Sequence, residues 1–289
     1  MPAHIYRTAY PSLLLGVALV SAFTSIQAVR AADIRNEAAK EDEAEVASHP
    51  SDASTLGSVR QTLHDWHVIV GAGAIYKPKF EGSSEYEISA IPFISATFYD
   101  RITIDPTGVT LKAYEKGPFS IHAKVGYDGG REEDDADRLR GLGDIDAGVT
   151  IGSKATYNLG SADVFMSVDQ TLGGSEGLLA TAGISAERPI SAKVIVGAEA
   201  SVTYADDNYM QAFFGVNAGQ SSRSGLAEFE AEAGIKSVEL SFSATYLATD
   251  HWVIKAKQTV GLLTGDAADS PITEDKIQSK TLLLLGYRF

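Results

Sequence analysis

The feature that most constrains the fold is a two-residue period of apolar side chains that runs from Trp66 to the end of the chain. In VELSFSATYLAT (residues 238–249), Val, Leu, Phe, Ala and Tyr alternate with Glu, Ser, Ser and Thr. The segments VTIGSKATYNL, KVIVGAEASVTY, FSIHAKVGY and GLAEFEAEAGIK (residues 225–236) alternate in the same way. Successive side chains of a β-strand point to opposite faces, so the pattern predicts strands with one apolar and one polar face.

Both a soluble β-sandwich and a transmembrane barrel show such alternation, and three observations favour the barrel. The segments are about ten to twelve residues long, which suits a tilted membrane-spanning strand better than the shorter strands of soluble sheets. Short and long links alternate along the chain. Aromatic residues gather at the ends of the segments, at Tyr76, Tyr99, Tyr127, Tyr157, Tyr204 and Trp252. We therefore predict an all-β, transmembrane, antiparallel up-and-down β-barrel.

The last nine residues, TLLLLGYRF, support this fold. Leu283, Leu285 and Tyr287 form a continuous apolar face, and the chain ends on Phe289. In a water-soluble protein this segment would be an exposed, sticky edge, whereas in an outer-membrane barrel it is the closing strand. We expect Tyr287 and Phe289 to form the assembly signal that the barrel assembly machinery recognises.

The links set the expected number of strands. We expect tight turns at Glu115–Pro118, Asn158–Ser161, Pro189–Ala192 and Thr249–His251, and longer links at Asp128–Gly143, Leu172–Gly177, Ala205–Tyr209 and Thr264–Gln278. The pattern gives about thirteen candidate strands, but a closed bacterial barrel needs an even number. Pro92 and Asp105-Pro106 make residues 87–114 the suspect stretch. We expect about twelve strands, with ten or fourteen as the alternatives.

The amino-terminal region has a different character. Arg7, the apolar run from Ser12 to Phe23 and the small residues around Ala31 predict a signal peptide over residues 1–31. The apolar run is too short for a helical membrane anchor. Residues 32–63 are acidic and lack aromatic side chains, which predicts a disordered periplasmic arm, with a short helix at residues 37–46 as the alternative. The barrel is then expected over residues 64–289.

Composition excludes several classes of function. The net charge of −14 disfavours nucleic acid as a partner. The absence of cysteine excludes thiolate metal sites, a catalytic thiol, disulfides and a lipid-modified cysteine. A mean hydropathy of −0.03 excludes a bundle of transmembrane helices. We expect an exported protein of the cell outer membrane, in contact with outer-membrane lipid and lipopolysaccharide.

No motif predicts a cofactor, a metal or an enzyme. HVIVGAGAIY resembles the start of a dinucleotide-binding fold, but Lys77-Pro78 follows where a helix should begin. Ser120, His122 and Lys124 share a polar face without a recognisable catalytic arrangement. Asp144 with Asp146, and Asp206 with Asp207, supply too few oxygen ligands for calcium, and solvated loop charge is favoured.

Charged residues on the polar faces predict a network in the barrel lumen. The candidate members are His122, Lys124, Glu228, Glu230, Glu232, Glu239, Lys255 and Lys257. Two interpretations stand: an ion-paired interior that fills or narrows the barrel, which is favoured, or a pore that prefers cations.

Several motifs together resemble the MipA/OmpV family, named for MltA-interacting protein. They are YKPKFEGSSEYEISAIPF, RLRGLGDID, YADDNYMQAFFGV, SGLAEFEAEAGIK, LLTGDAADSPI and the terminal GYRF. The resemblance covers Trp66–Phe289 and excludes the amino-terminal arm.

The resemblance implies an outer-membrane barrel that is not an enzyme. It further implies a scaffold that joins a lytic transglycosylase to a murein synthase of the penicillin-binding class. The alternatives are a narrow pore or small-solute-binding barrel, and a surface antigen or adhesin.

Overall fold

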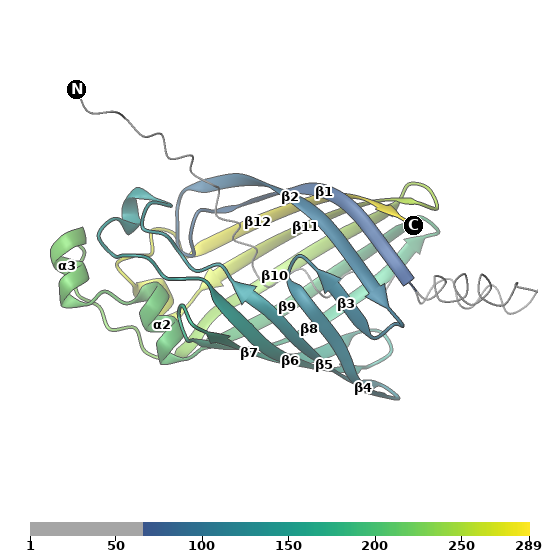
Figure 1. Ribbon diagram of the computed structural model, residues 1–289, viewed down its shortest axis with the longest axis horizontal. Coiled ribbons are helices and arrows are strands. Elements are labelled where there is room, and N and C mark those ends of the chain that lie inside the picture. Colours follow the sequence, from purple (N-terminus) through teal and green to yellow (C-terminus); the bar gives the residue numbers. More distant parts are fainter. Residues whose placement is uncertain (1–65) are drawn as a thin grey trace, which may run out of the picture.

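The computed structural model describes residues 66–289, and within them the chain forms one closed antiparallel barrel (Figure 1). Each strand pairs with its neighbours in sequence, and the last strand pairs with the first. The strands are β1 (Trp66–Pro78), β2 (Tyr86–Phe98), β3 (Ile102–Asp105), β4 (Gly108–Lys116), β5 (Phe119–Asp128), β6 (Gly148–Asn158), β7 (Asp163–Leu172), β8 (Leu178–Ser191), β9 (Val194–Ala205), β10 (Gly234–Leu247), β11 (Trp252–Leu263) and β12 (Ile277–Arg288). The predicted barrel and its count of twelve strands are confirmed.

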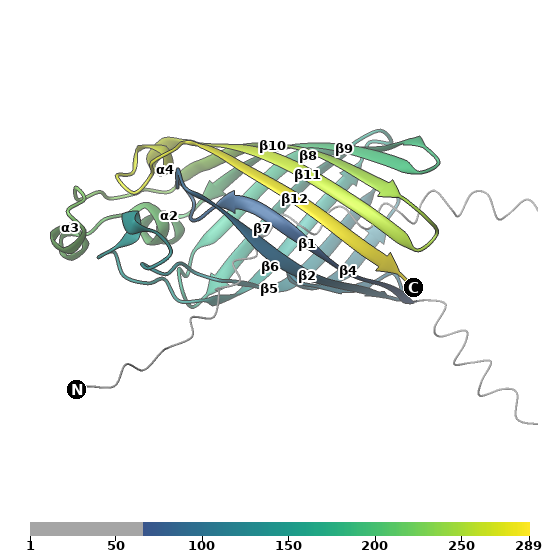
Figure 2. The same cartoon turned by 90° about the horizontal axis from the view of Figure 1, so that it is seen from above.

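The two ends of the barrel differ, as Figure 2 shows. One end, here called the turn end, carries the turns that follow β2, β4, β6, β8 and β10, the start of β1 and the carboxyl terminus. The opposite end carries the longer links and the helices η4 (Asp137–Leu139), α2 (Asp207–Phe214), α3 (Ala218–Ser224) and α4 (Gly265–Asp269). No helix in residues 66–289 is long and apolar enough to cross a membrane.

The outer surface of the barrel is apolar. Along β12, for example, Leu283 and Leu285 face outward and are about half exposed. Exposed aromatic side chains lie at both ends of the strands: Tyr76, Tyr127 and Tyr204 near the longer links, and Tyr99, Tyr114, Tyr157, Tyr246 and Trp252 near the turns. An apolar band between two aromatic belts is the surface that a lipid bilayer requires.

Closure depends on the terminal segment, as its sequence predicted. β12 pairs with β11 on one side and with β1 on the other, from Ile69↔Arg288 to Tyr76↔Thr281. Tyr287 stacks on His251 and meets Trp252 and Phe289 edge-on, with ring centroids 4.9–5.3 Å apart. The last three residues therefore join β12 to the β10–β11 turn as well as to β1.

Residues 225–233, predicted as a strand, do not belong to the barrel. They run in an extended path in the link between α3 and β10, and Phe229 forms an isolated bridge with Val216. Apolar and polar side chains alternate in this link because Phe229 and Ala231 pack against the helices between the strands, while the residues next to them face solvent. The predicted link Ala205–Tyr209 is accordingly too short, because the connection from β9 to β10 covers residues 206–233.

The stretch 87–114, suspected because of its prolines, does form strands β2, β3 and β4. β2 pairs with β3 only through Ala96–Phe98, so Pro92 has a strand neighbour on the β1 side alone. The Arg101 N–H donates to the Phe98 carbonyl, so the backbone of Phe98 points toward β3. Alternation places the Pro92 nitrogen on the same, unpaired side, where a proline removes no ladder hydrogen bond.

The longer links fold into a cap with its own core. One cluster joins α2 and α4 through Tyr209, Met210, Phe214, Ala267 and Ala268, together with Ala205, Ala231 and Leu263. The second joins the β1–β2, β5–β6, β9–β10 and β11–β12 links through Phe80, Ala136, Leu139, Leu142, Val216 and Ile272. The largest fully buried side chains of the described residues, led by Phe214 and Leu139, all lie here. The cap is thus the most tightly packed part of the protein.

The predicted signal peptide and acidic arm, residues 1–31 and 32–63, lie outside the described residues.

The terminal aromatic generates a prediction about assembly. We expect Phe289→Asp to reduce the amount of barrel in the outer membrane strongly, while molecules that do insert keep normal heat-modifiable mobility on gels. A charge at the membrane interface costs only about 0–1 kcal/mol, so a large defect would have to arise during insertion. Quantitative immunoblots of membrane fractions measure this, with Asp134→Asn in the cap as the control. Wild-type levels of the Phe289→Asp protein would show that this residue is not an assembly signal.

Candidate functional site

The barrel encloses a cavity of about 1170 Å³ that extends from the underside of the cap to the turn end. Phe80, Glu81, Tyr209 and Phe213 form its roof, and inward-facing side chains of the strands form its wall. The wall is mixed: serines, threonines and charged groups alternate with apolar residues such as Phe93, Phe165 and Leu282.

Five of the eight residues predicted for the lumen network face the interior. His122, Lys124, Glu239 and Lys257 line the cavity. Lys255 lies two residues from Lys257 on the same face of β11 and is only 2% exposed. The alternation pattern placed these side chains correctly because each belongs to a real barrel strand.

Glu228, Glu230 and Glu232 are not part of the lumen, and this prediction is wrong. All three are exposed in the link before β10. The backbone N–H of Glu232 donates to Asp266 in α4, which fastens this link to the cap. Their side chains point to solvent because the alternate residues, Phe229 and Ala231, pack into the cap.

Ion pairs cross the lumen, but with partners other than those expected. Lys257 on β11 reaches Glu199 on β9 at 3.6 Å, and Glu239 on β10 reaches Lys280 on β12 at 3.9 Å. Each pair skips a strand, because Lys257 stands directly opposite Ser243, and Glu239 opposite Gly261. Sequence reasoning missed Glu199 and Lys280, although both lie on polar faces of recognisable strands.

Lys124 and Lys154 face the cavity without a salt bridge to any residue in 66–289. Lys154 lies 4.1 Å above the centre of the Phe165 ring. His122 lies opposite Lys154 on the neighbouring strand. No hydrogen bond joins His122 to Ser120 in the described residues, so they do not form a nucleophile and base pair.

A buried ionic contact connects the roof to the wall. Glu81, in the link between β1 and β2, forms a salt bridge with Lys236 of β10 and accepts a hydrogen bond from the Tyr209 hydroxyl at 3.1 Å. Burial opposes ionisation of Glu81, but Lys236 and Lys280 outweigh it, so the pKa of Glu81 lies below its ordinary value. Burial, with Glu81 beside it, raises the pKa of Tyr209.

Three of the four aspartates weighed as calcium ligands have structural roles. Asp206 caps the amino terminus of α2, and Asp207 accepts from the Ala233 N–H at 2.6 Å. Asp144 accepts from the Glu133 N–H at 2.8 Å. No group of three or more histidine, aspartate or glutamate side chains suited to a metal occurs in residues 66–289.

HVIVGAGAIY is part of strand β1, as its sequence context predicted. A Cβ atom on Gly71 would lie 2.1 Å from the Leu285 carbonyl oxygen, and one on Gly73 would lie 2.2 Å from that of Leu283. The glycines are therefore required by the close approach of β12 rather than by a phosphate.

A closed antiparallel barrel with an apolar exterior, two aromatic belts and a partly polar interior is a transmembrane β-barrel of the outer-membrane type. The chain belongs to the MipA family, because the family model described as MltA-interacting protein MipA matches residues 70–289. This confirms the resemblance carried by the sequence motifs. No curated protein matches the chain.

Several solved outer-membrane barrels are similar to this chain. OmpT of Vibrio cholerae is 10% identical with a TM-score of 0.33, and the match covers 78% of this chain and 98% of OmpT. OmpF of Salmonella typhi is 10% identical with a TM-score of 0.37, covering 78% and 97%. The translocator domain of NalP from Neisseria meningitidis is 11% identical with a TM-score of 0.34, covering 82% and 96%. Likenesses this distant carry no argument about function.

The ionised state of Glu81 should stabilise the cap. Its pKa is lowered by folding, so this contribution is complete above the ordinary carboxyl pKa and is lost as the pH falls through the lowered value. We expect Glu81→Gln to lower the free energy of local opening of α2 by about 1–3 kcal/mol at neutral pH. Amide hydrogen exchange of residues 207–214 measures it.

The matched control is Glu85→Gln in the same link. Glu85 pairs with Lys79 near the surface and is 53% exposed, so its loss should change exchange by less than about 0.5 kcal/mol. Equal effects of the two substitutions would contradict a specific role for Glu81.

Proposed function

We propose that the protein is a non-enzymatic scaffold of the outer membrane, which holds a murein hydrolase and a murein synthase at its periplasmic side. The observation that carries this proposal is the cap. Its packed core lies across one end of the lumen, with Glu81, Tyr209 and Phe213 as the roof of the cavity. A barrel covered in this way is poorly suited to free diffusion of solutes, which disfavours a general pore.

The arrangement of the ends supports the same proposal. β1 begins with Trp66 at the turn end, beside the short turns. In outer-membrane barrels, short turns face the periplasm and longer links face outward. The periplasmic side would then present the turns and the acidic arm to cell-wall enzymes.

Membership of the family indicates which partners the scaffold would bind. The description of the matching model names an interaction with MltA. The resemblance of the motifs implies a lytic transglycosylase and a penicillin-binding murein synthase. The lumenal groups add no reason for catalysis, because His122 and Ser120 make no catalytic contact in the described residues.

Site-specific photocrosslinking in intact cells tests the scaffold. We expect a photoreactive residue at Ser161 or Lys193, both in turns, to capture a lytic transglycosylase and a murein synthase. The same residue at Asp134, exposed in the cap, should capture neither and is the matched control. Capture of these enzymes from Asp134 would invert the orientation, and capture from none of the three positions would contradict the scaffold.

A second candidate is a barrel that binds or slowly passes small solutes. The observation that favours it is the cavity itself, which holds Lys124 and Lys154 without salt bridges in the described residues. Lysines that form no salt bridge in a partly enclosed space are available to an anionic solute.

Single-channel recording in planar bilayers separates the two candidates. The scaffold predicts no steady open current, because the cap covers the lumen. Steady current in the intact protein, reduced by Lys124→Gln together with Lys154→Gln, would favour the solute-binding barrel instead. A cation-selective current unaffected by these substitutions would revive the interpretation of the lumen as a cation pore.

A further inference from the structure

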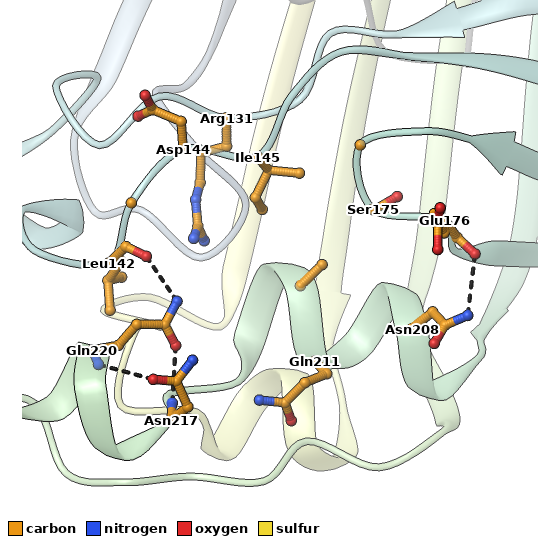
Figure 3. A pocket seen from close by; sticks show the side chains of 13 residues that line it. Arg131, Leu142, Asp144, Ile145, Ser175, Glu176, Asn208, Gln211, Asn217 and Gln220 are labelled. Atoms are coloured by element: carbon orange, nitrogen blue, oxygen red, sulfur yellow. Dashed lines mark hydrogen bonds between the residues drawn. The ribbon is translucent and has the colours of Figure 1, made fainter.

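The cap contains a second pocket of about 370 Å³ (Figure 3), and Arg131 lines both this pocket and the lumenal cavity. The link between β5 and β6 forms one wall, the link between β7 and β8 forms the other, and α2 and α3 form the floor. The volume suits a molecule of the size of a free amino acid or a dipeptide.

Arg131 is the charged group buried in this pocket. It is only 5% exposed. Its Nη1 donates to the Phe213 carbonyl at 2.8 Å, and its Nε has no hydrogen-bond partner in residues 66–289. Nor does it form a salt bridge within that part of the chain. A buried guanidinium is costly unless it is paired, and its planar fork of donors matches a carboxylate.

Arg131 is charged under physiological conditions. Burial lowers the pKa of its guanidinium to about 10, with Asp135 opposing the shift. At neutral pH the group still carries its proton, since 10 lies well above 7. It therefore offers a fixed positive charge to a ligand.

The opposite wall carries a negative charge. Glu176 and Asn208 lie across the pocket from Arg131 (Figure 3). The Asn208 side chain donates to the Glu176 backbone carbonyl at 3.3 Å, but the exposed Glu176 carboxylate has no ion pair in the described residues. This carboxylate, with Asp144 on the rim, would repel a purely anionic ligand such as phosphate.

The remaining polar lining consists of side-chain amides. Gln211 and Asn208 face the pocket, and Asn217 and Gln220 cap α3 at its edge. Gln220 also donates to the Leu142 carbonyl at 2.7 Å, which fixes the floor to the first wall. Side-chain amides both donate and accept, so they match the N–H and C=O groups of a peptide.

We propose that this cap pocket binds a small zwitterion of the amino-acid or short-peptide class. Arg131 holds the ligand carboxylate, and Glu176 on the opposite wall meets its ammonium group. The pocket lies on the cap, so it is independent of the scaffold role of the turn end.

Glycylglycine is the probe, and two blocked analogues separate the contacts. Glycylglycinamide lacks the carboxylate, and N-acetylglycylglycine lacks the ammonium group. We expect the full-length protein in lipid nanodiscs to bind glycylglycine in titration calorimetry. Each analogue should bind roughly tenfold or more weakly, because it lacks one of the two charge-assisted contacts.

Arg131→Gln should weaken binding of glycylglycine at least about tenfold. The matched control is Arg138→Gln. Arg138 is another cap arginine with a buried Nε that lacks a partner in the described residues, and it donates to the Pro271 carbonyl outside the pocket. The Arg138→Gln substitution should leave the binding of glycylglycine unchanged. Equal loss in both variants, or no detectable binding by the wild-type protein, would overturn the proposal.

A second variant tests the pocket without changing Arg131, in case Arg131→Gln unfolds the cap. Ala212 lies on α2, lines the pocket and is half-buried, so Ala212→Leu fills space without altering the charged groups and keeps a good helix former. Hydrogen exchange of α2 reports whether the cap is intact. Loss of binding with an intact cap supports the site, and undiminished binding overturns it.

Discussion

The structure depends on the closed ladder of backbone hydrogen bonds that joins β12 to β1. In a bilayer an unpaired backbone group finds no water, so a strand edge must be paired or kept small. The register between Ile69↔Arg288 and Tyr76↔Thr281 closes the sheet, and the glycines at 71 and 73 allow the two backbones to approach. Closure of the sheet separates an apolar outer face from an enclosed lumen.

The ladder is weakest beside the short strand β3. Its four residues pair with only three residues of β2, so most of β2 has a strand neighbour on one side alone. Pro92 lies in that part, with its nitrogen on the unpaired side. A proline there also discourages another strand from adding to the edge. Pro92 interrupts the strand pattern in the sequence. The barrel tolerates it because the short strand β3 leaves this part of β2 unpaired on one side.

The cap changes how the molecule is understood. Loops of barrels are commonly treated as exposed connections, yet here they bury the largest enclosed side chains of the described residues. The contact of Glu81 with Lys236 and Tyr209 joins this cap to the barrel wall. Because the cap has a core of its own, it covers the lumen and also holds a second pocket, which shares Arg131 with the lumenal cavity. The proposed scaffold and the proposed cap site therefore use opposite ends of one rigid barrel.

The sequence by itself determined the barrel, its even number of strands, its closing strand and the lumenal position of His122, Lys124, Glu239, Lys255 and Lys257. The physical reason is local: within a strand, alternation alone decides which side chains face inward. The same pattern wrongly placed Glu228, Glu230 and Glu232 in the lumen. An extended link that packs on the cap has the same two-residue period as a strand in a sheet. Only the tertiary structure decided which charges meet, since Lys257 reaches Glu199, and Glu239 reaches Lys280, across an intervening strand. Only the tertiary structure, too, brought Arg131, Asn208 and Glu176 into one pocket, because these residues come from links far apart in the chain and share no local pattern.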